Sequence, residues 1–127
     1  MSSPLTVAGA LSFPIDEGSP AIDVPLSFIG QFDESTCTTV KLADTGSMAV
    51  SLGTIDAVKG LLVKVDANVD AAPVRIRVNG LVAEADGFVE VSPGGMLLLC
   101  SPNPVDGVTS IDVDWTTDNA IRMWAFG

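Results

Sequence analysis

The chain has 127 residues, enough for one domain that buries roughly two-thirds of the surface exposed by its unfolded form. Acidic residues outnumber basic ones by 16 to 6 and no Lys or Arg precedes Lys41, which argues against nucleic acid and anionic membranes as partners. Hydrophobic residues make up 47% of the chain, a high fraction for so acidic a protein, and this predicts that apolar surface is covered by another copy or a partner.

The N-terminal residues lack the features of a secretory signal. Residues 1–4 carry no basic side chain, and the apolar stretch at residues 5–13 is interrupted by polar residues and glycine. No stretch of the sequence reaches transmembrane length. We therefore expect synthesis in the cytosol without secretion, where Cys37 and Cys100 stay free as buried thiols, with a disulfide as the less favoured alternative. Two cysteines without histidine cannot complete a zinc site, and no cofactor is expected.

The first half of the chain predicts strands separated by turn-forming residues. Residues 5–13 form one strand, and the segment PIDEGSPAID that follows predicts an irregular connection. We expect residues 1–22 to form an N-terminal arm. A strand at residues 24–32 contains Pro25, which confines it to a sheet edge or a first position. Shorter strands are expected at residues 38–42, 48–52 and 61–65.

Residues 73–85 contain the clearest local signal for a β-hairpin. Valine and isoleucine alternate with arginine up to Asn79-Gly80, a pair that favours a type I′ turn. This register places Arg75 opposite Glu84. Further strands are expected at residues 88–91 and 96–100. The second of them is an unbroken apolar run, which predicts burial on both faces.

The last two strands, residues 111–116 and 120–126, are predicted to form another hairpin. A three-residue loop at residues 117–119 sets Asp114 opposite Arg122, so that opposite charges meet across the strands. Strict alternation of apolar and acidic residues at 111–115 supports the first of these strands.

Alternation in the last strand also separates its side chains into two apolar faces. Ile121 and Met123 point one way and are expected to enter the core. Trp124 and Phe126 point the other way, where no second sheet is left to cover them. We expect these two aromatic residues to lie at an interface with another copy or with another protein.

The spacing of the strands predicts the fold class. Strands recur about every 8–12 residues with no helix of note, which is typical of an all-β protein. We expect a single-domain antiparallel β-sandwich or jelly roll at residues 23–127, preceded by the irregular arm at residues 1–22.

Catalysis in this chain would have to use carboxylates, because the sequence contains no histidine or tyrosine. Asp44-Thr45-Gly46 matches the tripeptide of aspartic peptidases, in which two aspartates share a proton over a water molecule. The glycine that should follow the supporting apolar strand is replaced by Cys100. Asp-Thr-Gly is also an ordinary turn sequence, so we expect Asp44 to be a turn residue and predict no catalytic residue.

Acidic residues also suggest cation sites, none of which the sequence completes. Asp66, Asn68 and Asp70 have the opening spacing of a calcium loop, but Ala71 and Arg77 replace the glycine and glutamate that such a loop requires. We predict a solvated loop here and no metal site.

Two further pairs have structural explanations that are favoured over binding. Asp112 and Asp114 share one strand face, as acids on any solvated sheet do. Trp115 and Trp124 could stack on a sugar ring, but a core or interface position is favoured for both.

Residues 60–127 resemble small virion proteins of tailed bacteriophages. In that group a lysine-bearing apolar strand leads to a V-x-V-x-N-G hairpin, as in GLLVKVDANVDAAPVRIRVNG. A V-x-P-G-G-x-L-L-L segment follows, as in FVEVSPGGMLLLC, and a final strand such as AIRMWAFG ends in glycine. The resemblance implies a jelly-roll or β-sandwich decoration (cement) protein, often a trimer that clamps capsid subunits, or a component of head fibres or tail.

We therefore expect a non-enzymatic virion structural protein, most simply a self-associating capsid decoration protein. Its expected partners are further copies of itself, with a trimer favoured, and the major capsid protein or another virion component. The alternatives are a tail or head-fibre module that contacts host glycan, and a retroviral-type aspartic peptidase that uses Asp44-Thr45-Gly46. No cofactor, nucleic acid or membrane partner is expected.

Overall fold

The computed structural model describes residues 3–14, 16–55, 57–79, 87–106, 108 and 110–127. Regular secondary structure in this part of the chain is entirely β-strand, which confirms the all-β prediction. The strands are β1 (Ser3–Pro14), β2 (Ala21–Phe32), β3 (Ser35–Leu42), β4 (Gly46–Ser51), β5 (Ala57–Val65), β6 (Val74–Val78), β7 (Val89–Val91), β8 (Met96–Asp106), β9 (Ser110–Trp115) and β10 (Asn119–Phe126).

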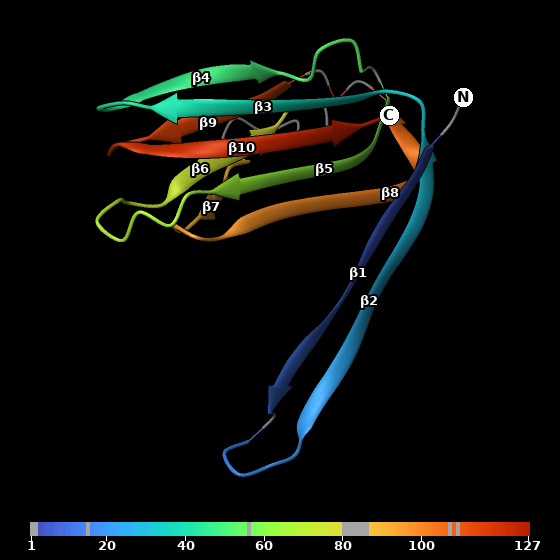
Figure 1. Cartoon of the computed structure of the whole chain (residues 1–127). Coiled ribbons are helices and arrows are strands. Elements are labelled where there is room, and N and C mark those ends of the chain that lie inside the picture. Colours follow the sequence, from blue (N-terminus) through green and yellow to red (C-terminus); the bar gives the residue numbers. More distant parts are fainter. Residues whose placement is uncertain (1–2, 15, 56, 80–86, 107, 109) are drawn as a thin grey trace.

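Strands β3 to β10 form two four-stranded antiparallel sheets that face each other (Figure 1). We call them the β10 sheet, of order β3-β10-β5-β8, and the β9 sheet, of order β4-β9-β6-β7. The first of these strands pairs with the last, the second with the last but one, and so on inward to β6 and β7. This nested pairing is that of a jelly roll, so the predicted sandwich or jelly roll is confirmed.

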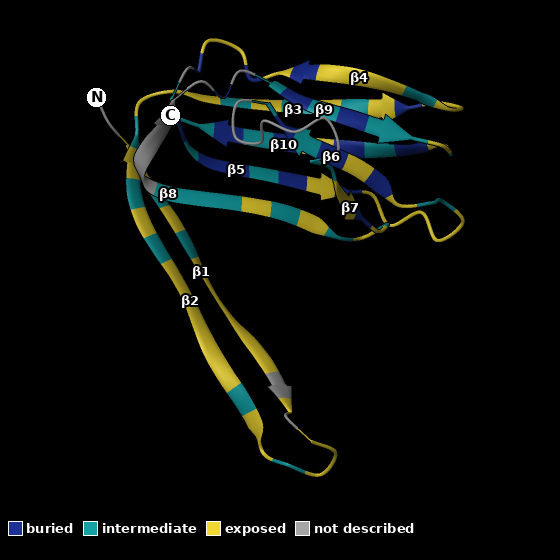
Figure 2. Ribbon diagram, turned by 180° about the vertical axis from the view of Figure 1, so that it is seen from behind, coloured by how far each residue is buried: buried dark blue, intermediate teal, exposed yellow. Residues whose placement is uncertain are grey.

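The core lies between the two sheets and is built from alternate side chains of each strand (Figure 2). On β10, Ile121 and Met123 are buried at 1% and 0% exposure, as their alternation predicted. The buried hydrophobic residues that the structure describes run from Leu42 to Ala125. The core is therefore built by β3 to β10 and the segments between them.

Strand β6 does not form the predicted two-residue hairpin. Its two edges are occupied by β7 and β9, so that Arg75 lies opposite Glu90 on one side and Asp114 on the other. The predicted pairing of Arg75 with Glu84 is therefore wrong, and residues 80–86, which include the predicted turn glycine, lie outside the described residues. The alternation identified the strand, but the jelly roll supplies partners from elsewhere in the chain.

The predicted hairpin of the last two strands is also wrong, because β9 and β10 belong to different sheets. Asp114 lies opposite Ser47 and Arg75, whereas Arg122 lies opposite Thr39 and Lys64. The segment between the two strands crosses from one sheet to the other. Opposite charges in neighbouring strands were not sufficient to identify the pairing.

Strand β8 is not buried on both faces, contrary to the prediction from its apolar run. Leu97 and Leu99 are half-buried and pack against the core. Met96 and Leu98 point outward and remain 58% and 45% exposed. The outer face of this strand therefore presents hydrophobic side chains that the chain itself does not bury.

The N-terminal arm is a regular β-hairpin, not an irregular segment. Strands β1 and β2 are paired without interruption from Ser3 opposite Phe32 to Pro14 opposite Ala21. The hairpin leaves the sandwich at the end where both chain termini lie and extends away from it (Figure 1). The strand predicted at residues 24–32 thus lies in the arm, and the sandwich begins with β3. Pro25 is tolerated in β2 because each strand of a two-stranded ribbon has one unpaired edge.

Candidate functional site

The outward-facing side chains of the β10 sheet form a largely apolar surface. Trp124 lies opposite Cys37 on β3 and Leu62 on β5, and Leu62 lies opposite Leu98 on β8. These side chains form one row across the whole sheet. We call this surface the β10-sheet face, and its apolar members are Cys37, Leu62, Met96, Leu98, Cys100, Trp124 and Phe126.

The base of the arm packs against one end of the β10-sheet face. The rings of Phe32 and Phe126 meet edge to face, with their centroids 4.9 Å apart. Leu5 lies so close to Gly60 that a Cβ atom built on this glycine would come within 2.7 Å of the leucine side chain. The arm therefore covers part of Phe126, for which the sequence predicted no covering sheet within the sandwich.

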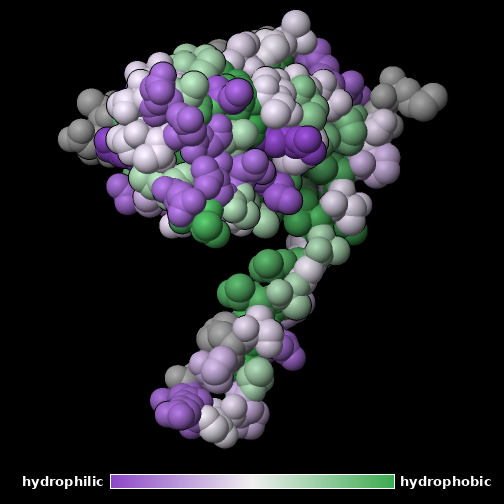
Figure 3. All heavy atoms as spheres, turned by 60° about the vertical axis from the view of Figure 1, so that its left-hand side comes forward, coloured by the Kyte–Doolittle hydropathy of each residue, from purple (hydrophilic) through white to green (hydrophobic). Residues whose placement is uncertain are grey.

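The apolar surface continues from the sheet onto the arm. An open pocket of about 260 Å³ lies in the angle between them. Leu5 and Val7 line it from the arm, and Leu62, Leu98 and Trp124 line it from the sheet. Hydrophobic side chains are visible along the arm and at its junction with the sandwich (Figure 3). The apolar surfaces of the β10 sheet and of the arm are therefore continuous where the arm leaves the sandwich.

The arm has one hydrophobic side, which we call the apolar arm face. Cross-strand partners in an antiparallel ribbon project to the same side. Leu11, Val24 and Leu26 on this side are 55%, 39% and 48% exposed. The partners on the apolar arm face are Leu5 with Gly30, Val7 with Phe28, Gly9 with Leu26, and Leu11 with Val24. The other side carries mainly small or polar residues, among them Thr6, Ala8, Ser12, Asp23 and Ser27, together with Ile29.

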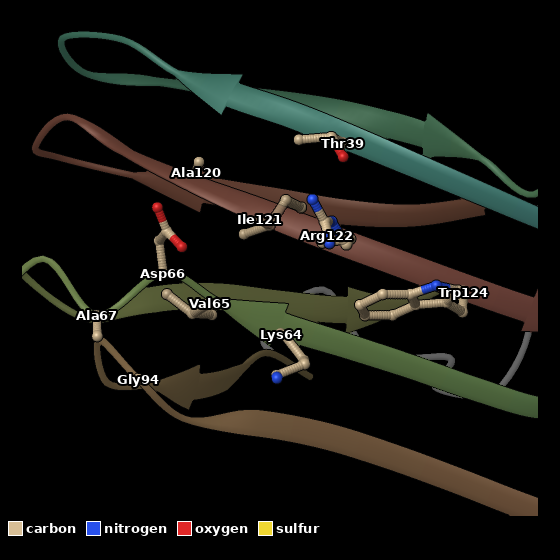
Figure 4. Close-up of a pocket in the computed structure, with 10 residues that line it drawn as sticks. All are labelled: Thr39, Lys64, Val65, Asp66, Ala67, Gly94, Ala120, Ile121, Arg122 and Trp124. Carbon is tan, nitrogen blue, oxygen red and sulfur yellow. The ribbon is translucent and has the colours of Figure 1, made fainter.

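Basic side chains occupy the half of the β10-sheet face that lies farther from the arm. Arg122 lies opposite Lys64, and Lys41 extends the same surface along β3. The guanidinium carbon of Arg122 is 5.7 Å from the centroid of the Trp124 ring. An open pocket of about 420 Å³ is formed here (Figure 4). The lining side chains that carry polar or aromatic groups are Thr39, Lys64, Asp66, Arg122 and Trp124.

The outer face of the β9 sheet differs, because it carries charged side chains of both signs on neighbouring strands. Arg77 forms an ion pair with Asp112, and Arg75 lies opposite Asp114 on the neighbouring strand. The guanidinium carbons of both arginines lie 4.7 and 5.1 Å from the centroid of the Phe88 ring. This face is thus a charged surface suited to contact with water. Of the two aspartates considered as a cation pair from the sequence, Asp112 binds Arg77 instead, and Asp114 lies opposite Arg75.

The hydrogen bonds at Asp112 predict a pH-dependent contribution to stability. Donation from Asn79 and from Arg77 lowers the pKa of the Asp112 carboxyl below its ordinary value of 3.8. A depressed pKa stabilises the folded state above the ordinary pKa, and this stabilisation is lost as the pH falls through the folded-state pKa. We expect the unfolding free energy of wild type to exceed that of Asp112→Asn by more near neutral pH than at about pH 2. Denaturant titrations of both proteins check this, and an equal difference at the two pH values would contradict it.

The predicted interface residues Trp124 and Phe126 lie together on the β10-sheet face, both half-buried. Trp115 lies on the β9 sheet, where its indole nitrogen donates a 3.0 Å hydrogen bond to the backbone oxygen of Ala43. The two tryptophans therefore do not form a shared stacking platform. The apolar neighbours of Trp124 on β5 and β8 were not identified as surface residues from the sequence, and for β8 the reason is that its apolar run suggested burial on both faces.

Asp44 lies in the exposed turn between β3 and β4, as predicted, with a φ angle of 58°. Its backbone nitrogen donates a 2.6 Å hydrogen bond to a carboxyl oxygen of Asp118. In the loop after β5, Asn68 accepts a hydrogen bond from the backbone nitrogen of Asp70 and donates one to the backbone oxygen of Asp118. Within the described residues no group of three His, Cys, Asp or Glu side chains is arranged to hold a metal ion.

Both cysteines are free, as predicted, but neither is fully buried. Cys37 is exposed and Cys100 is half-buried, and partial burial raises the pKa of the Cys100 thiol. They lie on β3 and β8, the opposite edges of the β10 sheet. Three strand spacings separate these edges by about 14 Å, which is beyond the reach of a disulfide.

No helix in the described part of the chain is long and apolar enough to cross a membrane.

Comparison of this chain with known proteins does not assign it to a family. No family model matches the sequence, and no curated protein matches it either. The chain is similar to a crystal structure described as ethanolamine utilization protein Q from Salmonella typhimurium, with 11% identity and a TM-score of 0.33. The match covers 96% of this chain and 97% of the other, and a similarity this low does not bear on fold or function.

Proposed function

We propose that this chain is a non-enzymatic structural protein of a tailed-bacteriophage virion, a decoration (cement) protein that self-associates and binds the capsid. The observation that carries the proposal is the pair of connected apolar surfaces, the β10-sheet face and the apolar arm face. Uncovered hydrophobic surface that spans several elements marks a protein–protein contact site. A projecting arm also gives the chain the reach to contact a neighbouring subunit.

The distribution of charge supports the same proposal. The β9 sheet presents charged side chains of both signs, so it suits the solvent-facing side of an assembly. The β10 sheet and the arm present hydrophobic side chains, so they suit the side that meets other protein. Jelly rolls occur in viral capsid proteins as well as in lectins and cupins, and the fold alone does not choose among these functions. We favour a trimer, as in the virion proteins that residues 60–127 resemble.

Phage particles assembled without this protein are expected to bind the purified chain. The measurement is co-sedimentation of the protein with such particles, titrated to saturation to obtain the number of copies bound. A variant of the opposite surface, Glu90→Gln, serves as a control and should bind like wild type, since Glu90 lies on the β9 sheet. Particles that take up no protein at any concentration tested would refute the proposed function.

A second candidate function, binding of host glycan by a tail or head-fibre module, is favoured by the pocket beside Trp124. An indole ring next to Arg122, Lys64 and Asp66 combines a stacking surface with charged hydrogen-bonding groups. Such a lining suits an acidic sugar. Saturable quenching of tryptophan fluorescence by acidic oligosaccharides, with loss of binding in Arg122→Ala, would favour this candidate over the first.

A further inference from the structure

We propose that the arm of each copy lies on the β10-sheet face of a neighbouring copy, with its acidic turn beside Lys64 and Arg122. This inference rests on the proposed self-association and specifies which surfaces carry it. The occupant of the apolar sheet face is then a second copy of this chain. Each copy donates one arm and receives one.

The arm requires a partner because of its own construction. An isolated two-stranded hairpin is marginally stable in water, and a hydrophobic face on such a ribbon adds a further cost of exposure. Contacts with its own sandwich involve the base of the arm, at Leu5 and Phe32. Leu11, Val24 and Leu26 lie farther out and are substantially exposed. A regular ribbon with one continuous apolar side is therefore suited to lie on a second apolar surface.

The β10-sheet face is a receiving surface of matching chemistry and sufficient width. Beyond the region covered by the arm base it presents Trp124, Leu62, Leu98 and Met96. A four-stranded sheet is about 14 Å wide between its edge strands, and the two strands of a ribbon lie about 5 Å apart, so the ribbon fits within the width of the sheet. Each arm strand has 12 residues, so the arm extends about 40 Å and can reach across to a neighbouring sandwich.

Charge complementarity selects the direction in which the arm lies. The described arm contains the acidic residues Asp16, Glu17 and Asp23, all at or near its turn, and the sequence has no Lys or Arg before Lys41. The receiving face is apolar near the arm base and basic farther away, at Lys64 and Arg122. Among the described residues an ion pair joins Arg77 to Asp112 on the β9 sheet, whereas Lys64 and Arg122 form none. When the turn of an incoming arm lies over the basic half, its acidic residues meet Lys64 and Arg122. The apolar side chains of the same arm then meet the apolar half of the face.

The first test introduces the same charge on opposite sides of the arm. Leu26 lies on the apolar arm face, and its neighbour Ser27 lies on the other side. Leu26→Asp is expected to weaken self-association at least tenfold, measured by light scattering over a dilution series, whereas Ser27→Asp should assemble like wild type. Unchanged near-ultraviolet circular dichroism would show that both variants keep a folded sandwich.

Cys37 reports directly on the receiving surface, because it is exposed and lies opposite Trp124. In assembled wild type we expect slow alkylation of Cys37, and in Leu26→Asp we expect the rate of a freely exposed thiol. Mass spectrometry of the alkylated peptide measures both rates. Fast alkylation of Cys37 in an assembled wild-type protein would overturn the inference, since the face would then be uncovered.

A charge exchange tests the position of the arm turn. Glu17→Lys and Arg122→Glu should each weaken assembly several-fold, and the two changes together in one chain should restore most of the loss. Failure of the double variant to regain assembly, or equal dissociation by Ser27→Asp and Leu26→Asp, would overturn the inference.

The outcomes separate this inference from the proposed function. A wild-type protein that is monomeric in solution but co-sediments with particles overturns the exchange of arms and leaves the virion function intact. A protein that exchanges arms but never binds particles overturns the virion function alone. Protection of Cys37 by an acidic oligosaccharide in a monomeric protein would assign the face to glycan and overturn the inference.

Discussion

Removal of residues 1–32 is expected to give a folded sandwich that no longer self-associates. The buried hydrophobic residues of the described chain begin at Leu42, so the core between the two sheets stays intact. A chain that starts at Asp33 also keeps the backbone hydrogen bonds that join Asp33 and Glu34 to Gly127. The sandwich loses the edge-to-face contact of Phe32 with Phe126, a pair worth about 1 kcal/mol.

We expect the truncated protein to unfold in one cooperative transition, with an unfolding free energy lower than that of the full chain by about 2 kcal/mol at matched dilution. Its mass by light scattering should be that of a monomer at concentrations where the full chain is assembled. Denaturant titration and light scattering together make the measurement. An assembled truncated protein would show that the arm is not required, and a truncated protein without cooperative unfolding would show that the arm belongs to the folding unit.

Alternation in the sequence predicted which side chains build the core, because that pattern depends only on the geometry of a single strand. Ile121 and Met123 are buried as expected, and the strand of which they are part has its other face half-exposed. The positions of most sandwich strands followed from the same reasoning. The position of a strand and the alternation of its side chains depend on residues that are close in the sequence, so they can be predicted from short segments.

Strand partners could not be predicted in the same way, because a jelly roll pairs strands that are distant in the chain. Arg75 has an acidic residue available in the segment after it and finds others on β7 and β9. Arg122 follows Asp114 closely, yet the chain crosses between the sheets before it. Opposite charges can meet across strands in many registers, so a favourable charge pair does not determine the topology.

The arm was recognised only in part, although its signal is present in the sequence. Leu5, Val7 and Leu11 alternate before the turn, and Val24, Leu26 and Phe28 alternate after it. The prolines and acids between them suggested an irregular connection and concealed the pairing of the two runs. A two-residue period on both sides of a glycine-containing turn favours a hairpin, and here Gly18 adopts the positive φ angle of 82°.

The apolar run of β8 shows how a wrong prediction of burial can indicate an interface. Hydrophobic residues on both sides of a strand predict that both sides are covered, and within one chain the outer side is not: Met96 and Leu98 are exposed. Strand β10 likewise has apolar side chains on both faces, and Trp124 lies on its outer face. When one face of a sheet is as apolar as a core but no other layer of the same chain covers it, we expect another chain to cover it.

Trp124→Ser is expected to have the largest effect of any single substitution on assembly. Trp124 sits at the centre of the row that crosses the β10 sheet, between Cys37 and Leu62, and it also lines both pockets of this face. Tryptophan at the centre of an interface is a frequent hot spot, and its loss typically costs roughly 2–4 kcal/mol. The dissociation constant should rise by about 30- to 1000-fold. Because the side chain is only half-buried in the single chain, the fold itself should lose less, about 1–2 kcal/mol.

Val69→Ser provides the matched control, since Val69 is 90% exposed in the loop after β5 and lies off the apolar surfaces. This variant removes an exposed hydrophobic side chain without touching the β10-sheet face and should assemble and bind particles like wild type. Light scattering gives the assembly state, and co-sedimentation with particles gives binding. A Trp124→Ser protein that stays fully assembled and fully binding would show that neither another copy nor the capsid covers this tryptophan. Loss of both activities with a retained cooperative fold would place Trp124 at the contact through which the chain acts.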